Sequence, residues 1–450
     1  MRLRFLPLVF LAAPLGAQQP IADRYRDVAN KIMDAALADT SVAWRKLAAF
    51  VDYSGPRLSG SANLERGIDW VVAEMKKDGL SNVRTEPAMV PRWVRGRESL
   101  TMRQPREADI PMLGLGGSVG TPAGGITAEL LVVKDFADLE KHAADAKGKI
   151  VLFDVPFTEY GATVQYRGAG ASAAAKVGAV ASLIRSVGPY GMRTPHTGAM
   201  RYDSTVARIP AAAIPMEDAM MFHRMQERGQ SVVLTLQMEA QTLPDVPSRN
   251  VMGELTGRDK TGEIVAMGGH IDSWDVGLGA MDDAGGIVVA WEAAKLLKRL
   301  GLVPRRTIRV VGWVNEENGG RGGAAYRDAH AKEAHSLLIE SDEGVFAPTG
   351  FGFTGSDSAR TIVRQVGTLL SRIGAGTISP NGGGADIGPL MRTGVPGMGL
   401  EVDGSKYFWF HHTPADTPDK LSPVDMQKCV AALAVMAYII ADLPDLLPRP

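Results

Sequence analysis

The chain has 450 residues, of which 45% are hydrophobic and 22% are charged, and its formal net charge is −1. A chain of this length is long enough for two or three domains with a large buried core. The near balance of charge argues against a disordered chain and against a nucleic-acid-binding protein, which is usually strongly basic, so we expect no nucleic-acid partner.

The N-terminus, "MRLRFLPLVFLAAPLGAQQP", has the order of a secretory signal. Arg2 and Arg4 form a positive region, residues 5–13 form a short apolar run, and turn residues lead to Ala17. We predict a signal peptide over residues 1–17 and therefore an exported protein, periplasmic or extracellular. A buried N-terminal helix is the alternative. The apolar run is too short to span a bilayer comfortably.

Residues 18–105 are predicted to form the first part of a domain that resumes at residue 242. Much of the segment 21–80 has helical character, and residues 61–80 show apolar side chains at helical spacing that stop at Gly79. A strand-like stretch follows over residues 82–93. We expect helices followed by one strand here.

Residues 106–241 have a different residue pattern, with short β-type runs, and are predicted to be a separate β-rich domain. This domain is inserted between the two parts of the first domain. Short β runs occupy residues 128–133, 149–155 and 232–238, and a segment of small residues covers 168–184. The region has no clear cluster of acids and histidines at metal-ligand spacing. Its order of segments resembles a protease-associated domain.

Residues 242–450 alternate between strand and helix patterns, which predicts parallel strands joined by crossover helices. The expected strands are 263–270, 307–314 and 336–341, and the expected helices are 285–300 and 322–334. The fold class is therefore α/β, with a mixed, mostly parallel sheet flanked by helices.

The last predicted helix starts at "SPVDMQK", where Ser422 is the expected cap and Pro423 occupies the first turn. Its apolar run is too short and too interrupted for a membrane span, so we expect none. The single cysteine of the chain, Cys429, lies in this run. It excludes an intrachain disulfide and is interpreted as a core residue.

Acids and histidines follow each predicted strand of the last region. In an open α/β sheet these strand ends meet at one edge, where ligands bind. The residues at this edge are His270, Asp272, Asp282, Asp283, Asn315, Glu316, Glu317, Asp342 and Glu343, with His411 and His412 late in the chain. Clustered carboxylates repel one another unless cations hold them. Imidazole and carboxylate ligands suit zinc best, with manganese and cobalt as competitors.

Six segments together resemble the M28 family of di-zinc exopeptidases and, within it, the plasma glutamate carboxypeptidase group. They are "GPRLSGS" (55–61), "GGHIDSWDVGLGAMDDAGG" (268–286), "NEENGGRGG" (315–323), "ESDEG" (340–344), "KYFWFHH" (406–412) and "HHTPADT" (411–417). The resemblance covers nearly the whole mature chain. It implies the zinc exopeptidase fold, with residues 18–105 and 242–450 as the catalytic domain, and two zinc ions per chain.

The resemblance also implies a ligand set. Asp282 resembles the carboxylate that bridges both metals, and the peptide bond after it is expected to be cis. His270 and Asp342 resemble the remaining ligands of one zinc ion. Glu317 and His412 resemble those of the other, and His412 is chosen over its neighbour by the family spacing "HTxxDT".

Further roles follow from the same resemblance. Glu316 resembles the general base, and Asp272 resembles the acid that orients His270 from behind. Asp386, in a glycine-rich loop, Tyr407 and His411 are candidate substrate-binding residues.

We therefore expect an exported zinc-dependent exopeptidase that hydrolyses short peptides, above all dipeptides, and that forms a homodimer like the group it resembles. An aminopeptidase acting on longer peptides is one alternative, because the sequence does not show whether an acid captures a free amine or a base captures a free carboxylate. A receptor-like relative without catalysis is the other. Such a relative should have lost ligands or the general base, which this sequence retains.

Overall fold

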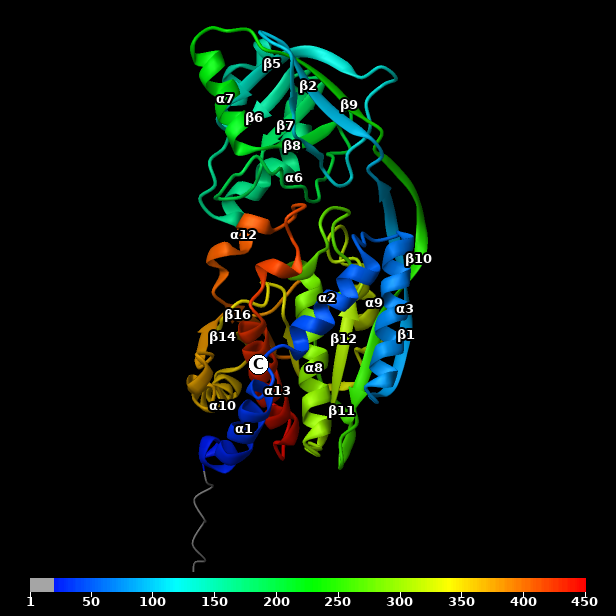
Figure 1. Ribbon diagram of the computed structural model, residues 1–450, viewed down its shortest axis with the longest axis vertical. Helices are drawn as coiled ribbons and strands as arrows, with labels where there is room; N and C mark the ends of the chain where they lie inside the picture. Colours follow the sequence, from blue (N-terminus) through cyan, green and yellow to red (C-terminus); the bar gives the residue numbers. More distant parts are fainter. Residues whose placement is uncertain (1–19) are drawn as a thin grey trace, which may run out of the picture.

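The computed structural model describes residues 20–450, so the predicted signal peptide over 1–17 lies outside the described residues. The strands form two sheets of eight strands each. The main sheet takes β1 and β10 to β16, and the second sheet takes β2 to β9 from the segment between them. We call residues 98–238, which hold the second sheet, the inserted unit; it lies at the top of Figure 1, above the main sheet.

The main sheet is mixed, which confirms the predicted α/β class. Its order is β1 (Ser81–Val94), β10 (Gln241–Leu255), β12 (Arg306–Trp313), β11 (Lys260–His270), β13 (Ala334–Glu340), β16 (Gly397–Val402), β14 (Pro348–Thr354) and β15 (Thr377–Pro380). The central strands β12, β11, β13 and β16 are parallel, whereas β10 and β14 join them antiparallel. The carboxyl ends of β11, β12 and β13 therefore share one edge.

Helices cover the main sheet. They are α1 (Ile21–Leu37), α2 (Val42–Ser54), α3 (Ala62–Lys77), α8 (Gly285–Arg299), α9 (Arg321–His330), α10 (Asp357–Thr368), α11 (Gly388–Met391) and α13 (Pro423–Asp442). The short helix α12 (Tyr407–Phe410) lies instead between the main sheet and the inserted unit (Figure 1). Short turns η1 (Ala280–Ala284), η2 (Ser371–Ile373), η3 (Gly404–Lys406) and η4 (Pro418–Lys420) lie in the connections. The predicted cap of α13 is present, because the Ser422 side chain accepts from the main-chain N–H of Asp425.

The inserted unit is a second α/β layer. Its strands, in sheet order, are β3 (Ala108–Ile110), β2 (Glu98–Gln104), β9 (Val233–Met238), β5 (Ile126–Val133), β6 (Ile150–Phe153), β7 (Ala181–Arg185), β8 (Ala211–Ile214) and β4 (Leu113–Gly114). Its helices are α4 (Phe136–Lys141), α5 (Ala143–Ala146), α6 (Tyr160–Lys176) and α7 (Met216–Glu227). Strand β2 precedes residue 106 and pairs with β9, so this sheet begins before the predicted boundary. The protease-associated character of the region stays a prediction.

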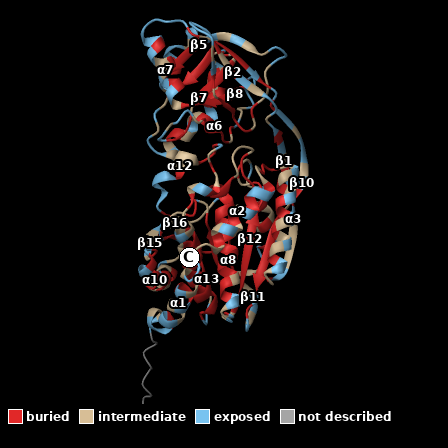
Figure 2. Cartoon of the chain, viewed as in Figure 1, coloured by how far each residue is buried: buried red, intermediate tan, exposed pale blue. Residues whose placement is uncertain are grey.

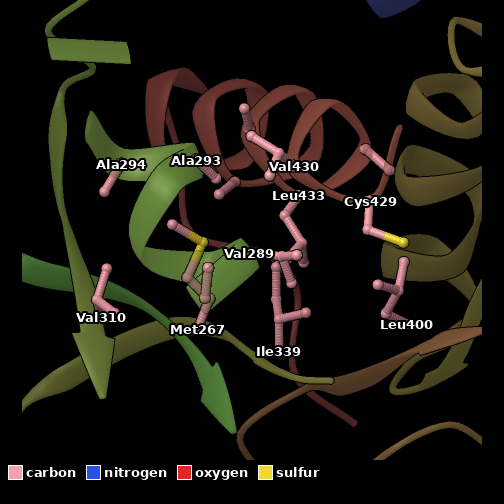
Figure 3. Packing of buried hydrophobic residues seen from close by; sticks show 14 of the residues in the cluster. Met267, Val289, Ala293, Ala294, Val310, Ile339, Leu400, Cys429, Val430 and Leu433 are labelled. Atoms are coloured by element: carbon pink, nitrogen blue, oxygen red, sulfur yellow. The ribbon is translucent and has the colours of Figure 1, made fainter. Parts of the chain in front are cut away.

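The largest core lies where α8 and α13 pack against the main sheet (Figure 3). Met267, Val289 and Leu433 meet there from a strand and two helices, and Cys429 is fully buried, as predicted for a core residue. Within residues 20–450, α13 is the one helix whose length and composition would suit a bilayer, and 83% of its apolar window is buried inside the protein. Burial by neighbouring elements accounts for its apolar character on all sides (Figure 2).

A long ribbon of β1 and β10 joins the two units. The two strands pair from Ser81 opposite Glu254 to Val94 opposite Gln241 (Figure 1). At the junction Trp274, from the loop after β11, is buried in the core of the inserted unit. The inserted unit is therefore fixed to the main sheet by a backbone ladder and by apolar packing.

Candidate active site

The end of β11 brings the first group of candidate ligands together, as the strand order predicts. His270 is the last residue of β11, and Asp342 lies just beyond the end of the neighbouring strand β13. The Nε2 atom of His270 is 3.1 Å from Asp282 Oδ1 and 3.2 Å from Asp342 Oδ1. One imidazole and two carboxylates thus converge on one point.

A second group meets on the other oxygen of the same aspartate. His412 Nε2 is 3.3 Å from Asp282 Oδ2 and 3.1 Å from Glu317 Oε2. His411 Nε2 also lies 3.5 Å from Asp282 Oδ2, and the two histidine rings stack with centroids 3.5 Å apart. Asp282 therefore stands between two groups of donors and offers one oxygen to each.

The donor set fits metal ions at both groups. Asp282 Oδ2 and Asp342 Oδ1 are buried and accept no hydrogen bond. Buried carboxylate oxygens without such partners are costly unless a cation compensates them. Burial alone would lower the pKa of His270, but the charge of Asp342 and the contact with Asp282 outweigh it and hold that pKa well above its ordinary value. The same negative potential would attract a divalent cation.

Two buried groups that had no assigned role in the sequence hold the glycine-rich loop. The guanidinium of Arg57 donates to the carbonyl oxygens of Ile271 and Leu278, both at 2.6 Å, and of Gly279 at 2.8 Å. Because Arg57 is fully buried, these carbonyls replace the water that the cation has lost. Only its place inside the "GPRLSGS" segment pointed to it.

Asp416 is the second of these groups. Its carboxylate accepts from the main-chain N–H groups of Ala280 at 3.0 Å, Met281 at 2.7 Å and Asp282 at 3.2 Å. Three N–H groups on one carboxylate fix the turn that carries Asp282. The peptide bond between Asp282 and Asp283 is cis, as the resemblance implied.

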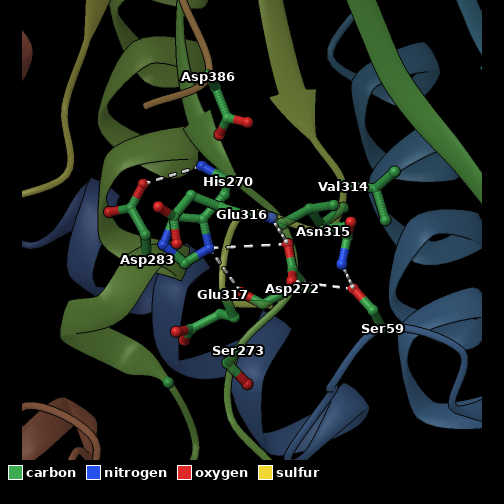
Figure 4. Close-up of polar contacts among 12 residues, drawn as sticks. Ser59, His270, Asp272, Ser273, Asp283, Val314, Asn315, Glu316, Glu317 and Asp386 are labelled. Atoms are coloured by element: carbon green, nitrogen blue, oxygen red, sulfur yellow. Dashed lines mark hydrogen bonds and ion pairs between the residues drawn. The ribbon is translucent and has the colours of Figure 1, made fainter. Parts of the chain in front are cut away.

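Asp272 differs from its expected contact with His270. The Nδ1 atom of His270 is 2.9 Å from the main-chain carbonyl of Asp272, whereas the carboxylate Oδ1 is 3.8 Å away. The carboxylate instead accepts from the main-chain N–H of Glu316 and from the Ser59 hydroxyl, both at 3.1 Å (Figure 4). The main chain thus orients the imidazole, while the carboxylate fixes the segment that presents Glu316.

Comparisons with known proteins agree with this geometry. The profile of Peptidase family M28 matches residues 250–437. Carboxypeptidase Q of Mus musculus is 47% identical over 94% of this chain and 91% of its own length. The chain belongs to peptidase family M28. It is accordingly a metallopeptidase, and the resemblance stated from the sequence is confirmed.

Solved structures support the fold of this M28 peptidase. The Peptidase M28 precursor of Shewanella amazonensis is 35% identical and superimposes with a TM-score of 0.91, covering 95% of this chain and 99% of that one. A zinc aminopeptidase from Bacillus subtilis has a TM-score of 0.66 at 22% identity, covering 89% and 94% of the two chains. The second likeness concerns the fold alone.

A cavity of about 430 Å³ opens on both ligand groups of this M28 peptidase. Its lining residues are Tyr160, Arg167, Asp282, Glu316, Glu317, Asp342, Glu343, Gly404, Tyr407, Phe408, His411 and His412. Tyr407 and His411, expected near substrate, are among them. Asp386 is not: its side chain is 1% exposed and lies apart from the lining. The structure therefore does not support direct contact between Asp386 and a substrate in this cavity.

The inserted unit contributes two lining residues that no sequence pattern had singled out. Arg167, on α6, donates from Nη2 to the hydroxyl of Tyr160 at 2.7 Å. It is the single lysine or arginine among the lining residues, and the structure shows no ion pair between it and a carboxylate within residues 20–450. The rest of the lining is acidic, because it includes five carboxylates.

Proposed function

We propose that this M28 peptidase is a zinc-dependent exopeptidase that hydrolyses short peptides, above all dipeptides. The observation that carries the proposal is the cavity of about 430 Å³. It is lined by residues of both ligand groups, by the carboxylate of Glu316 and by one cation, Arg167. This volume suits a small ligand rather than an extended chain. The relatives named carboxypeptidase Q support the peptidase chemistry.

Two zinc ions would be held by the two groups of ligands. His270 and Asp342 would hold one, Glu317 and His412 the other, and Asp282 would be shared through its two oxygens. When bound, zinc acidifies water and polarises the peptide carbonyl. The Bacillus subtilis aminopeptidase that shares this fold is a zinc enzyme, which supports the choice of metal.

Glu316 is proposed as the general base. Its side chain lines the cavity. The hydrogen bond from its main-chain N–H to the Asp272 carboxylate fixes the backbone position from which this side chain extends. It is adjacent in sequence to the ligand Glu317, and neighbouring side chains diverge, so Glu316 is free to move a proton. Burial, followed by the charge of Asp342, raises its pKa well above the ordinary value. A carboxylate of raised basicity takes the proton of water and passes it to the leaving amine.

The lining of the cavity combines one guanidinium with five carboxylates, which favours a substrate with both termini free. We propose that Arg167 receives the substrate carboxylate, because guanidinium pairs with carboxylate in two parallel hydrogen bonds. Glu343 and the neighbouring acids would face the free amine. A longer peptide would have to place its remaining residues outside this cavity. An aminopeptidase remains the second candidate, because the acidic lining could bind the free amine of a longer peptide without any contact to its carboxylate.

A panel of peptides tests the proposal. It compares a dipeptide, its N-acylated form and a tetrapeptide with a free amine, each with and without a chelator. We expect the dipeptide to have the highest kcat/KM, and the chelator to abolish activity that zinc then restores. Faster hydrolysis of the tetrapeptide would instead support the aminopeptidase. Activity that resists chelation, or no hydrolysis of any member, would contradict the proposal.

Two further proposals concern the mature protein. We propose export with removal of residues 1–17, for which N-terminal sequencing of secreted or periplasmic protein should give Gln18 as the first residue. We also propose a homodimer, which light scattering of the purified protein should show as twice the chain mass. A receptor-like role without catalysis is disfavoured, because Glu316 and four of the five candidate ligands line one cavity, and the fifth, His270, lies 3.1 Å from the lining residue Asp282.

A further inference from the structure

The candidate ligand His412 is held by the inserted unit, although it belongs to the main domain. The main-chain N–H of Thr197, in the loop between β7 and β8, donates to the carbonyl of His412 at 3.0 Å. In return His412 Nδ1 lies 3.2 Å from the carbonyl oxygen of Thr197. These two contacts between Thr197 and His412 link the inserted unit to the main domain, and we call them the clasp.

The clasp fixes both the backbone and the ring of His412. His412 has a φ of 60°, a left-handed conformation that is unfavourable for a residue with a side chain and needs support from its surroundings. When Nδ1–H donates to Thr197, the unprotonated Nε2 faces Asp282 and Glu317. Donation through one ring nitrogen is how a metal-binding histidine is usually oriented. Arg167 Nη1 is 3.4 Å from the same carbonyl, and as a cation it can only donate there.

Thr197 is itself anchored in the inserted unit. Its hydroxyl donates to the carbonyl of Gly114, in β4, at 2.8 Å. The main-chain N–H of Gly116 donates to the carbonyl of Gly198 at 2.9 Å. Since Thr197 is fully buried, the sheet edge determines where its carbonyl lies.

Glu317, the partner of His412, depends on the inserted unit through Trp274. The main-chain N–H of Trp274 donates to Glu317 Oε1 at 3.1 Å. Its indole lies against Gly116, where an added Cβ would come within 2.0 Å of Cη2. The ring is thus seated in the core of the inserted unit while its main chain holds the carboxylate.

The other half of the site shows no such dependence. Within residues 20–450, the hydrogen bonds and ion pairs of His270 come from Asp272, Asp282, Asp283 and Asp342, which all belong to the main domain. The ion pair of Asp342 is made with His270. This half is therefore built without the inserted unit.

We propose that the inserted unit positions one half of the metal site. Thr197 orients His412, and the burial of the Trp274 indole in the inserted unit orients Glu317 through the main chain of Trp274. The inserted unit is then part of the metal site as well as a wall of the cavity. The proposal rests on the two-zinc function proposed above. Thr197 is a positioning residue, since it acts through His412 and touches no metal itself.

Calorimetric titration of metal-free protein with Zn²⁺ tests the proposal, using Thr197→Val to remove the hydroxyl that anchors the clasp. We expect the wild type to bind two equivalents. In the variant, the affinity for one equivalent should fall by about tenfold or more, as for other residues that orient a ligand, while the other stays unchanged. Thr127→Val is the matched control, because it removes the 2.9 Å hydroxyl contact with Thr235 inside the same unit, and both affinities should persist.

Gly116→Ala provides an independent variant if Thr197→Val does not fold by circular dichroism. Its added methyl group would displace the Trp274 ring and should weaken the same single equivalent. Unchanged affinities, or equal weakening of both equivalents, would overturn the inference while leaving the two-zinc function intact. A wild type that binds fewer than two zinc ions would overturn the proposed function and this inference together.

Discussion

Glu316 and Glu317 are neighbours in the chain with different surroundings. Glu317 is 3.1 Å from His412 Nε2 and accepts from the main-chain N–H of Trp274. Glu316 lines the cavity, and its side chain forms no hydrogen bond or ion pair within the described residues. The two carboxylates are therefore separated into a candidate ligand and a candidate base.

Glu316→Gln should keep the metal and lose most of the turnover. The amide has nearly the same shape but cannot take a proton, so kcat should fall by at least about 100-fold, the lower range for loss of a general base. The measurement is kcat on a dipeptide together with the zinc content. Glu317→Gln is the comparison and should lose zinc as well. Near-wild-type turnover in Glu316→Gln would disprove the assignment.

Asp416→Ala should destabilise the loop that carries Asp282. The substitution leaves three buried N–H groups without an acceptor, and each such group costs about 1–3 kcal/mol. We expect the free energy of unfolding to fall by about 3 kcal/mol or more, measured by urea denaturation. Asp419→Ala, at a solvent-exposed position nearby in sequence, is the control and should change stability little.

The sequence predicted which candidate ligands come together better than it predicted the residues that hold them. His270, Asp342 and Glu317 each follow an apolar strand, so periodicity placed them at one edge. Arg57 and Arg167 follow no such rule, because a lone arginine far away in the chain is usually a solvated surface residue. Their roles depend on tertiary contacts that local patterns do not encode.

At the level of elements, the strands and helices with regular apolar patterns were predictable, whereas β14 was not. Strands β11, β12 and β13 and helices α8 and α9 lie where apolar runs and helical spacing predicted them. Strand β14 contains "GFGFTG" (350–355) in large part, and glycine disfavours strands. Its pairing with β16 stabilises it instead, which is a contact between distant segments.

Ser422→Ala should weaken α13 through its N-terminus. The serine side chain accepts from the main-chain N–H of Asp425, and loss of such a cap costs about 1 kcal/mol. Chemical denaturation should show this decrease in the free energy of unfolding. Ser422→Asp, which keeps a capping oxygen, should be close to wild type. Equal destabilisation by both substitutions would show that the cap is not the cause.

At the scale of the whole molecule, the cavity belongs to both units. Tyr160 and Arg167 come from α6 of the inserted unit, whereas the ligand residues come from the main domain. The sequence indicated a separate middle segment but could not show how closely it approaches the ligands. That approach depends on the β1–β10 ribbon and on the packing of Trp274.

Substrate length should limit hydrolysis, because the inserted unit and the main domain both line the cavity and restrict its size. In a series of unblocked peptides with two to five residues, kcat/KM should fall by about tenfold or more once the chain outgrows the cavity, since orientation at the metals is lost. Arg167→Met should reduce the preference for a free C-terminal carboxylate over its amide. A flat dependence on length would contradict a cavity that selects dipeptides.

The pairing of the first helix with the last has a consequence for biosynthesis. Helix α1 packs against α13, and the Tyr25 hydroxyl contacts the Asp442 carboxylate at 3.0 Å. All strands of the inserted unit, in contrast, lie between residues 98 and 238. The inserted unit can therefore complete its sheet while the chain is still being made, whereas α1 must wait until the final helix emerges. Nascent chains long enough to expose Trp274 but not α13 should already protect the inserted unit from proteolysis and leave the N-terminal helices exposed.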